Sequence, residues 1–386
     1  MSNIKKLIEK FSSNFDFNKL VNIVDYIQPT KYIVSSQNYD NSYSTPVLTP
    51  GKSFILGYTN EKEGIYEANQ NNPIILFDDF TCSFHWVDFP FKIKSSASKI
   101  IIPINKNKIN FRYVYFAMKE IKINISEHKR QWIQNFSNIS IPIPPLEIQN
   151  EIVRILDKYT ELEKELEKEL ELRTRQYDYY RNKLFVDFVN FEYNPLWKVT
   201  NWNKKFNNVE KNKQQKITKF LSVSAKKLKE LLVEEGNIKL LSTGIFDGYT
   251  NELLANNFIC EGEVITLPEG GNANIKYWNG KFVNSLNLIA TSSNDNLYSL
   301  KFIYYFLIFK NKWIENQYRG SNVKHPNMAE ILELKIPIPS FKKQQKIVEI
   351  LDKFSNIINN LENGIPKEIE LRKKQYLYWR NKLLSF

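Results

Sequence analysis

Cysteine and histidine are scarce in this chain, and long apolar runs are absent. The 386 residues contain two cysteines, Cys82 and Cys260, which lie far apart, and three histidines. Such a set supplies neither a disulfide framework nor a zinc site, and it fits a reducing compartment. The longest apolar run, "FIYYFLIF" at 302–309, is too short to cross a bilayer, and the first residues lack a signal-peptide core. We therefore expect a cytoplasmic protein with no membrane role.

Nucleotide- and cofactor-binding motifs are also missing. The chain has no Asn/Asp-Pro-Pro-aromatic motif of the kind that adenine methyltransferases carry, and "EGGN" at 269 does not form a glycine-rich cofactor turn. The segment "TPGKSF" contains Gly51, Lys52 and Ser53, but Pro46 stands where a phosphate-binding loop requires glycine. This pattern favours a turn between strands, and we expect no cofactor in this chain.

The remaining polar residues form no catalytic set. Asp78 and Asp79 are not followed by the Glu/Asp-x-Lys pattern of a metal-dependent nuclease. The three histidines, His85, His128 and His325, lie outside any serine or cysteine nucleophile context. The sequence therefore predicts a protein that catalyses no reaction and holds no metal ion.

Positive charge is abundant. Lysine and arginine number 54 against 42 aspartates and glutamates, which gives a formal charge of +12. This excess favours a polyanionic partner such as nucleic acid. An AT-rich genome would also enrich lysine, asparagine and isoleucine, so charge alone does not establish the partner. With 42% hydrophobic residues, the chain is long enough for two folded domains.

The sequence contains an internal repeat. "IPIPPLEIQNEIVRILDKY" at 141–159 returns as "IPIPSFKKQQKIVEILDKF" at 336–354, and "ELRTRQYDYYRNKLF" at 171–185 returns as "ELRKKQYLYWRNKLL" at 370–384. Both copies have apolar residues at spacings of three and four, which predicts long helices that pack along another helix. Prolines fit the extended approach and the first helical turn. Gly364 and Pro366 predict a kink or break in the second copy.

The sequences outside the repeats predict two globular domains. Residues of about 20–140 and 200–335 contain short β-branched and aromatic runs separated by Gly, Asn and Asp turns, which indicates mixed α and β structure. "FRYVYFAMKE" and "LKFIYYFLIFK" are typical of aromatic-rich helices. The order is globule, helix, globule, helix.

The repeated segments, with "TPVLTPGKSFILGYT", "LLSTGIFDGYTNE" and "YRGSNVKHPNM", resemble the specificity subunits of type I restriction-modification systems. The resemblance covers nearly the whole chain. It implies an α+β fold in which two mixed α/β target-recognition domains, 1–140 and 191–335, are separated by conserved helical regions, 141–190 and 336–386. It also implies that these helices pair antiparallel as a coiled coil with an internal pseudo-twofold repeat. One departure is the shorter first helix, which lacks the "GIPKE" element.

The same resemblance implies a function in bacterial defence. Each globule would read one half of a bipartite, asymmetric double-stranded DNA target, and the paired helices would dock two modification subunits. Those subunits would bind S-adenosylmethionine and methylate adenine. Restriction and translocation subunits, which use ATP and Mg²⁺, would join the same assembly.

Candidate DNA-reading residues lie in polar loops, because directional donors and acceptors read base edges. The loop around "GGNANIKYW" and the loop "YRGSNVKHP" supply the candidates in the second globule; corresponding positions supply those in the first. The full set is Ser83, His85, Lys94, Ser96, Lys129, Arg130, Asn272, Asn274, Lys276, Tyr277, Arg319, Ser321, Lys324 and His325. The alternative is a hairpin in which Tyr277 and Trp278 simply pack, with solvated surface lysines.

Candidate partner-binding residues lie in the second repeated segment. They are Tyr177, Tyr180, Arg181, Tyr376, Trp379 and Arg380. The alternative is that the aromatic side chains hold the two helices together while the arginines pair with a modification subunit.

Two other classes of function remain open from the sequence. One is an enzyme with an unrecognised site, which would show activity as the isolated chain. The other is a coiled-coil scaffold without sequence-specific DNA binding, which would assemble without salt-sensitive binding to DNA.

Overall fold

The chain forms two compact units in the computed structural model, which describes residues 16–384 apart from 52, 106, 107, 124–128, 187, 189, 190, 215, 247, 361 and 362. Unit 1 comprises Met1–Leu166 and Ile369–Phe386, and unit 2 comprises Glu167–Glu368. The boundaries fall within two long helices, so each helix contributes to both units. The division into two target-recognition domains, 1–140 and 191–335, and two helical regions, 141–190 and 336–386, therefore stays a prediction.

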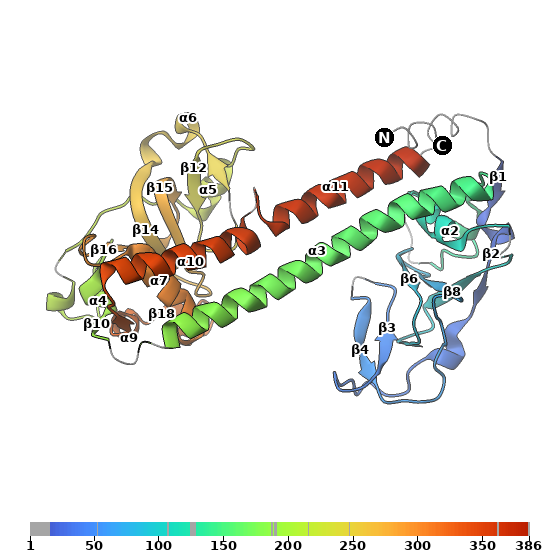
Figure 1. The fold of residues 1–386 in the computed structure, drawn as a ribbon, viewed down its shortest axis with the longest axis horizontal. Helices are drawn as coiled ribbons and strands as arrows, with labels where there is room; N and C mark the ends of the chain where they lie inside the picture. The colour runs from blue at the N-terminus through green and yellow to red at the C-terminus, as the bar shows by residue number, and fades with distance from the viewer. Residues whose placement is uncertain are drawn as a thin grey trace. The chain divides into compact units, whose positions relative to one another are not determined.

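The duplicated sequence forms the long helices. Helix α3 (Leu146–Val186) is 41 residues long, and the second copy is divided into α10 (Phe341–Asn359) and α11 (Ile365–Leu384). The first helix starts directly after Pro144 and Pro145, and the second copy breaks just before Gly364, as predicted (Figure 1). Among the described residues, none of the helices combines the length and apolarity that a membrane span requires.

The globular part of unit 1 is built on a four-stranded sheet of order β2-β8-β5-β6 and a three-stranded sheet of order β4-β3-β7. The aromatic-rich segment predicted as a helix is α2 (Phe111–Met118). Short 3-10 helices are η1 (Leu20–Asn22), η2 (Pro29–Tyr32) and η3 (Phe136–Asn138). The strands are β1 (Phe17–Lys19), β2 (Val24–Ile27), β3 (Thr45–Leu48), β4 (Ile55–Thr59), β5 (Ile74–Asp78), β6 (Phe84–Val87), β7 (Lys92–Ile93), β8 (Ser98–Pro103) and β9 (Ser140–Pro142).

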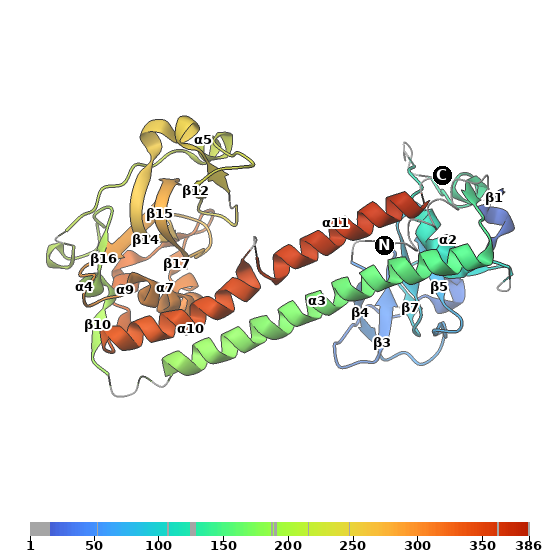
Figure 2. The ribbon, with the colours of Figure 1, turned by 45° about the horizontal axis from the view of Figure 1, so that its top comes forward.

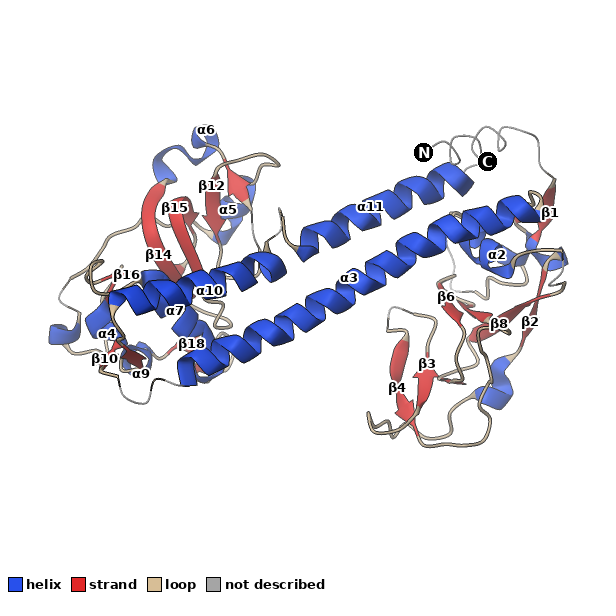
Figure 3. Ribbon diagram, viewed as in Figure 1, coloured by secondary structure: helices blue, strands red, loops and turns tan. Residues whose placement is uncertain are grey.

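The globular part of unit 2 is built on a six-stranded sheet of order β11-β16-β14-β15-β12-β13. The strands of unit 2 as a whole are β10 (Tyr193–Pro195), β11 (Thr200–Trp202), β12 (Ile238–Leu241), β13 (Tyr249–Thr250), β14 (Cys260–Pro268), β15 (Lys276–Asn284), β16 (Asn287–Ser292), β17 (Tyr318–Arg319), β18 (His325–Pro326) and β19 (Lys335–Pro337). Its helices are α4 (Leu196–Val199), α5 (Ala225–Glu230), α6 (Glu252–Ala255), α7 (Leu300–Phe309), α8 (Asn311–Glu315) and α9 (Met328–Leu332), with 3-10 turns η4 (Lys211–Lys213) and η5 (Asn256–Phe258). Figure 3 shows the strands gathered in the globular parts. Two mixed α/β globules with long helices confirm the predicted fold class.

A buried glutamine joins each globule to its long helix. In unit 1 the Gln149 side chain accepts a hydrogen bond from the Asn110 amide at 2.9 Å and donates one to the Pro144 carbonyl at 2.8 Å. Asn110 is the N-cap of α2, so the glutamine ties the start of the aromatic helix to the start of α3. Both partners are backbone groups that would otherwise be buried without a hydrogen bond.

Unit 2 repeats this contact. Gln344 accepts from the amide of Ser299, the N-cap of α7, at 2.9 Å and donates to Pro339 and Leu297 carbonyls, each at 2.9 Å. Gln149 and Gln344 are each only 1% exposed. The glutamine of the duplicated motif therefore links the aromatic helix to the start of the long helix in both copies.

A duplicated ion pair fixes the aromatic helix further along. Arg112 lies 2.8 Å from Asp157 in unit 1, and Lys301 lies 2.7 Å from Asp352 in unit 2. Asp157 and Asp352 occupy matching positions in the repeated motif. The pairs are partly exposed, so we expect them to orient the helices more than to stabilise them.

A short pair of strands closes each globule where the chain enters and leaves it. Strand β1 pairs antiparallel with β9 in unit 1, and β10 pairs antiparallel with β19 in unit 2. The two ends of each globule thus meet beside the long helix. Such closure makes each globule a self-contained insert on its helical support.

The long helices pack antiparallel within unit 1. Leu383 and Leu384 of α11 lie in one apolar cluster with Ile152 of α3, while Lys373 pairs with Glu163 at 3.4 Å. Residues later in α3 therefore contact residues earlier in α11.

In unit 2, α3 contacts α10 instead. The rings of Tyr180 and Phe354 stack at 5.5 Å, and Tyr177 shares the main apolar cluster with Ile347, Leu351 and Ile358. In both Figure 1 and Figure 2 the red helices run beside green α3. The apolar stripe predicted from spacings of three and four is the surface that makes these contacts.

We predict that Gln344→Leu loosens α7 in unit 2. Hydrogen–deuterium exchange of the α7 amides should show their opening free energy lowered by about 1–3 kcal/mol, because buried backbone groups lose their partners. Gln345→Leu is the matched control, since Gln345 is exposed. Equal effects from the two variants would show that the buried contact does not hold α7.

Candidate nucleic-acid interface

Two predicted DNA-reading loops lie against each other in unit 2. The turn between β14 and β15 meets the segment between β17 and β18: the Gly271 amide donates to the Lys324 carbonyl at 2.8 Å, and a His325 ring nitrogen lies 2.7 Å from the Glu269 carbonyl. Gly271 has a φ of +96°, a backbone conformation that favours glycine. The structure thus brings the two candidate segments together.

The exposed candidates sit on this pair of loops. Asn272 lies on the first, and the second carries Arg319, Ser321, Lys324 and His325. Their amide, hydroxyl and cationic groups are suited to base edges and phosphates.

Asn274 and Lys276 instead bind a third loop. The Lys276 ammonium donates to the Ser242 carbonyl at 2.9 Å and to the Phe246 carbonyl at 3.2 Å, and the Asn274 amide donates to the Gly244 carbonyl at 2.6 Å. These contacts attach residues 242–246 to the turn between β14 and β15. We call residues 242–246, 269–275 and 319–325 together the loop edge of unit 2.

Tyr277 is engaged within the globule. Its hydroxyl donates to Glu263 at 2.7 Å, and the Lys301 ammonium lies 5.1 Å from its ring centre. Burial and the neighbouring carboxylate raise the pKa of the Tyr277 hydroxyl. Its ring packs against Tyr304 with ring centres 5.6 Å apart, while its role in reading DNA stays a prediction.

The corresponding loops of unit 1 also meet, around buried Asp79. Amides of Gln131 and Trp132 donate to the Asp79 carbonyl at 2.7 Å and to its carboxylate at 2.9 Å. Arg130 is exposed and lies 4.0 Å from the same carboxylate. Lys129, next to it, is exposed as well. The turn after β5 thus holds the segment that carries two of the predicted cations.

Ser83 and His85 line one cavity of about 440 Å³ in unit 1. Ser83 donates to the Pro50 carbonyl at 2.8 Å, while His85 donates through Nε2 to the Gly51 carbonyl at 3.1 Å and stacks on Phe54 with ring centres 4.4 Å apart. Burial lowers the pKa of His85, so its imidazole is neutral at pH 7. Nδ1 is then an acceptor.

Lys119 lines the same cavity and was not among the predicted residues. Burial, with Arg380 and Arg112 nearby, lowers its pKa to about 8. Its ammonium lies over the rings of Phe84 and Tyr115. Lys119 directly follows α2, and Lys310 directly follows α7 in the second globule.

The other candidates of unit 1 lie on the segment between β7 and β8. Lys94 places its ammonium 5.8 Å from the ring centre of Tyr39, and Ser96 is exposed while its carbonyl accepts from Gln28 at 3.2 Å. Both stay predicted phosphate neighbours. His128 lies outside the described residues, and within the described part of the chain no group of three His, Cys, Asp or Glu residues could hold a metal ion.

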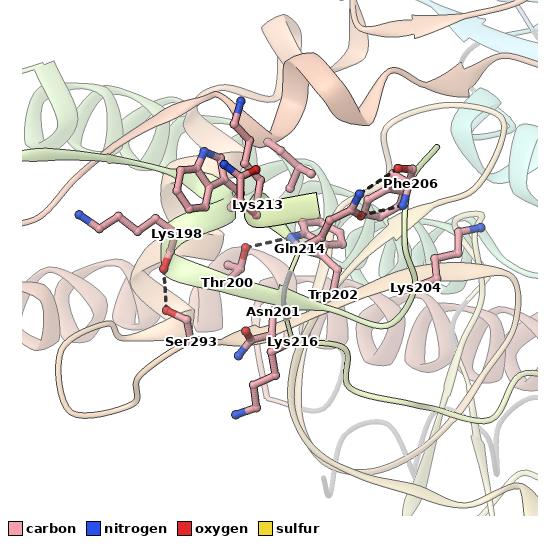
Figure 4. Close-up of a pocket in the computed structure, with 13 residues that line it drawn as sticks. Lys198, Thr200, Asn201, Trp202, Lys204, Phe206, Lys213, Gln214, Lys216 and Ser293 are labelled. Carbon is pink, nitrogen blue, oxygen red and sulfur yellow. Dashed lines mark hydrogen bonds between the residues drawn. The ribbon is translucent and has the colours of Figure 1, made fainter. Parts of the chain in front are cut away.

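A lysine-lined pocket of about 250 Å³ lies beside β11 in unit 2 (Figure 4). Lys204 of this pocket pairs with Glu269 at 2.6 Å, which links the pocket to the loop edge. Lys213 pairs with Glu210 and Glu333, at 2.8 and 3.0 Å. Two further lysines, Lys198 and Lys216, line the pocket. No sequence motif marks this cluster, because its members are brought together by the packing of the loop after β11.

The long helices carry a duplicated exposed face. In unit 2, Leu172 and Tyr179 of α3 are 51% and 60% exposed; in unit 1, the matching Leu371 and Tyr378 of α11 are 47% and 56% exposed. An ion pair accompanies each face, Glu171 with Arg175 and Glu370 with Lys374. Leucine and tyrosine seven residues apart lie on one side of a helix. We call the two surfaces the Leu-Tyr faces.

The six residues predicted to bind a partner lie mainly in the seams between helices. Tyr177 is buried under the Arg181 guanidinium, whose carbon lies 5.2 Å from the ring centre, and Tyr376 and Trp379 pack against the core of unit 1. Arg181 pairs with Asp178 at 3.0 Å, and Arg380 pairs with Glu120. Tyr180 is 39% exposed and stacks on Phe354. Their partner role stays a prediction, while helix packing describes their contacts in this structure.

Comparisons of the sequence identify related proteins. The family described as "Type I restriction modification DNA specificity domain" matches twice, over residues 12–172 and 209–371. The chain is 36% identical to the type I restriction enzyme EcoR124I/EcoR124II specificity subunit of Escherichia coli, across 100% of this chain and 97% of that protein. It is 27% identical to a putative type I restriction enzyme specificity subunit, S.HindORF215P, of Haemophilus influenzae, across 87% of this chain and 86% of that protein.

Comparison of the fold gives a similar result. The crystal structure of a type I restriction-modification system S subunit from M. genitalium superposes with a TM-score of 0.67 at 15% identity, covering 97% of this chain and 96% of that one. At this identity the match concerns the fold.

We predict that Lys276→Met frees the loop at 242–246. Chymotrypsin should cut after Phe246 about tenfold faster in the native protein, because loss of the charged hydrogen bonds lowers the cost of opening the loop. Lys281→Met is the control, since Lys281 pairs with Glu252 on the surface. An unchanged cleavage rate would mean that Lys276 does not hold this loop.

Proposed function

Because the chain belongs to the family of type I restriction-modification DNA specificity subunits, we propose that it reads a bipartite, asymmetric double-stranded DNA target. Each globule reads one half-site. The observation that carries this proposal is the repeated glutamine anchor, Gln149 and Gln344, which holds two globules whose loops carry different side chains. Equal anchoring with unequal loops accounts for one protein that reads two different sequences.

The loops described above supply the proposed DNA contacts. In unit 2 the exposed donors Asn272, Arg319 and Lys324 contact bases or phosphates, while Lys276 and Asn274 act through the loop they hold. In unit 1, Lys129 and Arg130 contact phosphates beside the cavity that contains Ser83 and His85. The net charge of +12 supports a salt-sensitive attraction to DNA.

The Leu-Tyr faces are the proposed docking sites for two modification subunits. Each face offers an apolar pair flanked by charge, which suits an amphipathic helix of a partner. Duplication of the face in units 1 and 2 supports two copies of one partner. Adenine methylation with S-adenosylmethionine, and ATP- and Mg²⁺-dependent restriction, belong to the modification and restriction/translocase subunits of this cytoplasmic assembly.

Exchange of one globule tests the function. We expect that replacing residues 196–334 with the second globule of another specificity subunit, in complex with the modification subunit, changes one half of the methylated DNA sequence and leaves the other half unchanged. The β10–β19 pair keeps the insertion point intact. Changes in both halves, or methylation without sequence preference, would contradict the assignment of one half-site to each globule.

Substitution on the Leu-Tyr faces tests the docking proposal. Tyr179→Ser and Tyr378→Ser should each reduce the complex from two modification subunits to one, and the double variant should retain none, because each tyrosine is the larger apolar group of its face. Native mass spectrometry measures the stoichiometry directly.

Leu253→Ser, which alters a leucine that is 87% exposed on α6 of the second globule, is the control. Full stoichiometry in the double variant would exclude these faces as docking sites.

A further inference from the structure

Ile245 is an isoleucine that the fold leaves almost entirely in water. Its side chain is 97% exposed, in the loop between β12 and β13. Its neighbour Phe246 turns inward and packs against the apolar cluster that contains Leu228 and Val283. The two adjacent apolar side chains therefore have opposite environments, one anchoring the loop and one presented to solvent.

The backbone on both sides of Ile245 is fixed. The Lys276 ammonium donates to the Ser242 carbonyl at 2.9 Å, to the Ser242 hydroxyl at 3.2 Å and to the Phe246 carbonyl at 3.2 Å. The Asn274 amide donates to the carbonyls of Thr243 and Gly244, at 3.3 and 2.6 Å. A single exposed apolar residue is ordinary on a protein surface. Here, however, a lysine and an asparagine hold the backbone on both sides of it.

Asn274 of the turn that carries exposed Asn272, and Lys276 at the start of β15, hold this loop. The same turn is bonded through Gly271 to Lys324, whose side chain is exposed beside Arg319 on the loop between β17 and β18. Ile245 therefore belongs to the loop edge of unit 2, among amide and cationic donors. An aliphatic side chain on such a surface is complementary to one feature of the DNA major groove. This feature is the 5-methyl group of thymine, an apolar group among hydrogen-bond donors and acceptors.

We propose that Ile245 contacts the 5-methyl group of a thymine in the half-site read by the second globule and so sets specificity at that base pair. This inference rests on the proposed function, since it names a reading residue within the same DNA-binding surface. Lys276 and Asn274 are positioning residues, which act by holding the loop that presents Ile245. A wedge between base pairs is a different use of isoleucine. The exposed Asn272, Arg319 and Lys324 of the loop edge favour the groove edge, because their donors match its hydrogen-bonding groups.

A chemical double-mutant cycle tests this contact. The complex of the chain with its modification subunit is titrated with a duplex that carries the mapped target, and each thymine of the second half-site is replaced in turn by uracil, which lacks only the methyl group. Wild-type protein should lose about fourfold in affinity at one position, the factor for one buried methyl-sized group. Ile245→Ala should bind the unmodified target more weakly by at least that factor and should no longer distinguish thymine from uracil there.

Leu253→Ala is the matched control, because Leu253 is an aliphatic residue of the same globule that is 87% exposed on α6. This variant should keep both the affinity and the response to uracil.

Three results would overturn the inference: no thymine whose replacement weakens wild-type binding, an unchanged response to uracil in Ile245→Ala, or an equal loss of affinity for target and random DNA in that variant. Absence of any sequence preference in the wild-type complex would instead overturn the proposed function itself.

Discussion

A buried glutamine at the beginning of each long helical segment is the constraint on which the rest of this structure depends. Gln149 and Gln344 satisfy backbone groups of two elements at once, the N-terminus of an aromatic helix and the proline-rich approach to a long helix. A shorter or apolar side chain would leave those buried groups without hydrogen-bond partners. The loss would be a large share of the free energy of unfolding of a marginally stable domain. The motif is duplicated because each globule needs the same attachment, and its prolines, glutamine and aspartate all serve that attachment.

This arrangement separates support from recognition. The anchoring contacts are alike in units 1 and 2, and so are the strand pairs β1–β9 and β10–β19 that close each globule. The loops at the hairpin turns differ: unit 1 places Asp79 beneath Arg130, whereas unit 2 joins Glu269 and Gly271 to the loop that carries Lys324. Sequence changes in these loops leave the attachment untouched, because none of the anchoring hydrogen bonds passes through them. If these loops read DNA as proposed, recognition can change in one globule without consequence for the helices.

The sequence alone predicted the elements with strong local signals. Apolar residues at spacings of three and four predicted the long helices, and Gly364 and Pro366 predicted the break between α10 and α11. Polar sequence rich in glycine predicted the loops that meet at Gly271. It could not predict which partners Asn274 and Lys276 bind, because the loop they hold is brought beside them by long-range strand pairing. Nor could it predict that Tyr179 is more exposed than Tyr180, whose ring stacks on Phe354. Adjacent helical positions differ by about 100° in direction, so a choice between them requires the packing of the neighbouring helix.

The central claim is that two anchored globules read two unequal sequences. The most direct measurement is single-molecule sequencing of DNA methylated by this chain together with its modification subunit, which records every methylated adenine with its surrounding bases. Our account predicts one asymmetric target made of two specified parts separated by unspecified bases. A continuous target, or two identical half-sites, would contradict it.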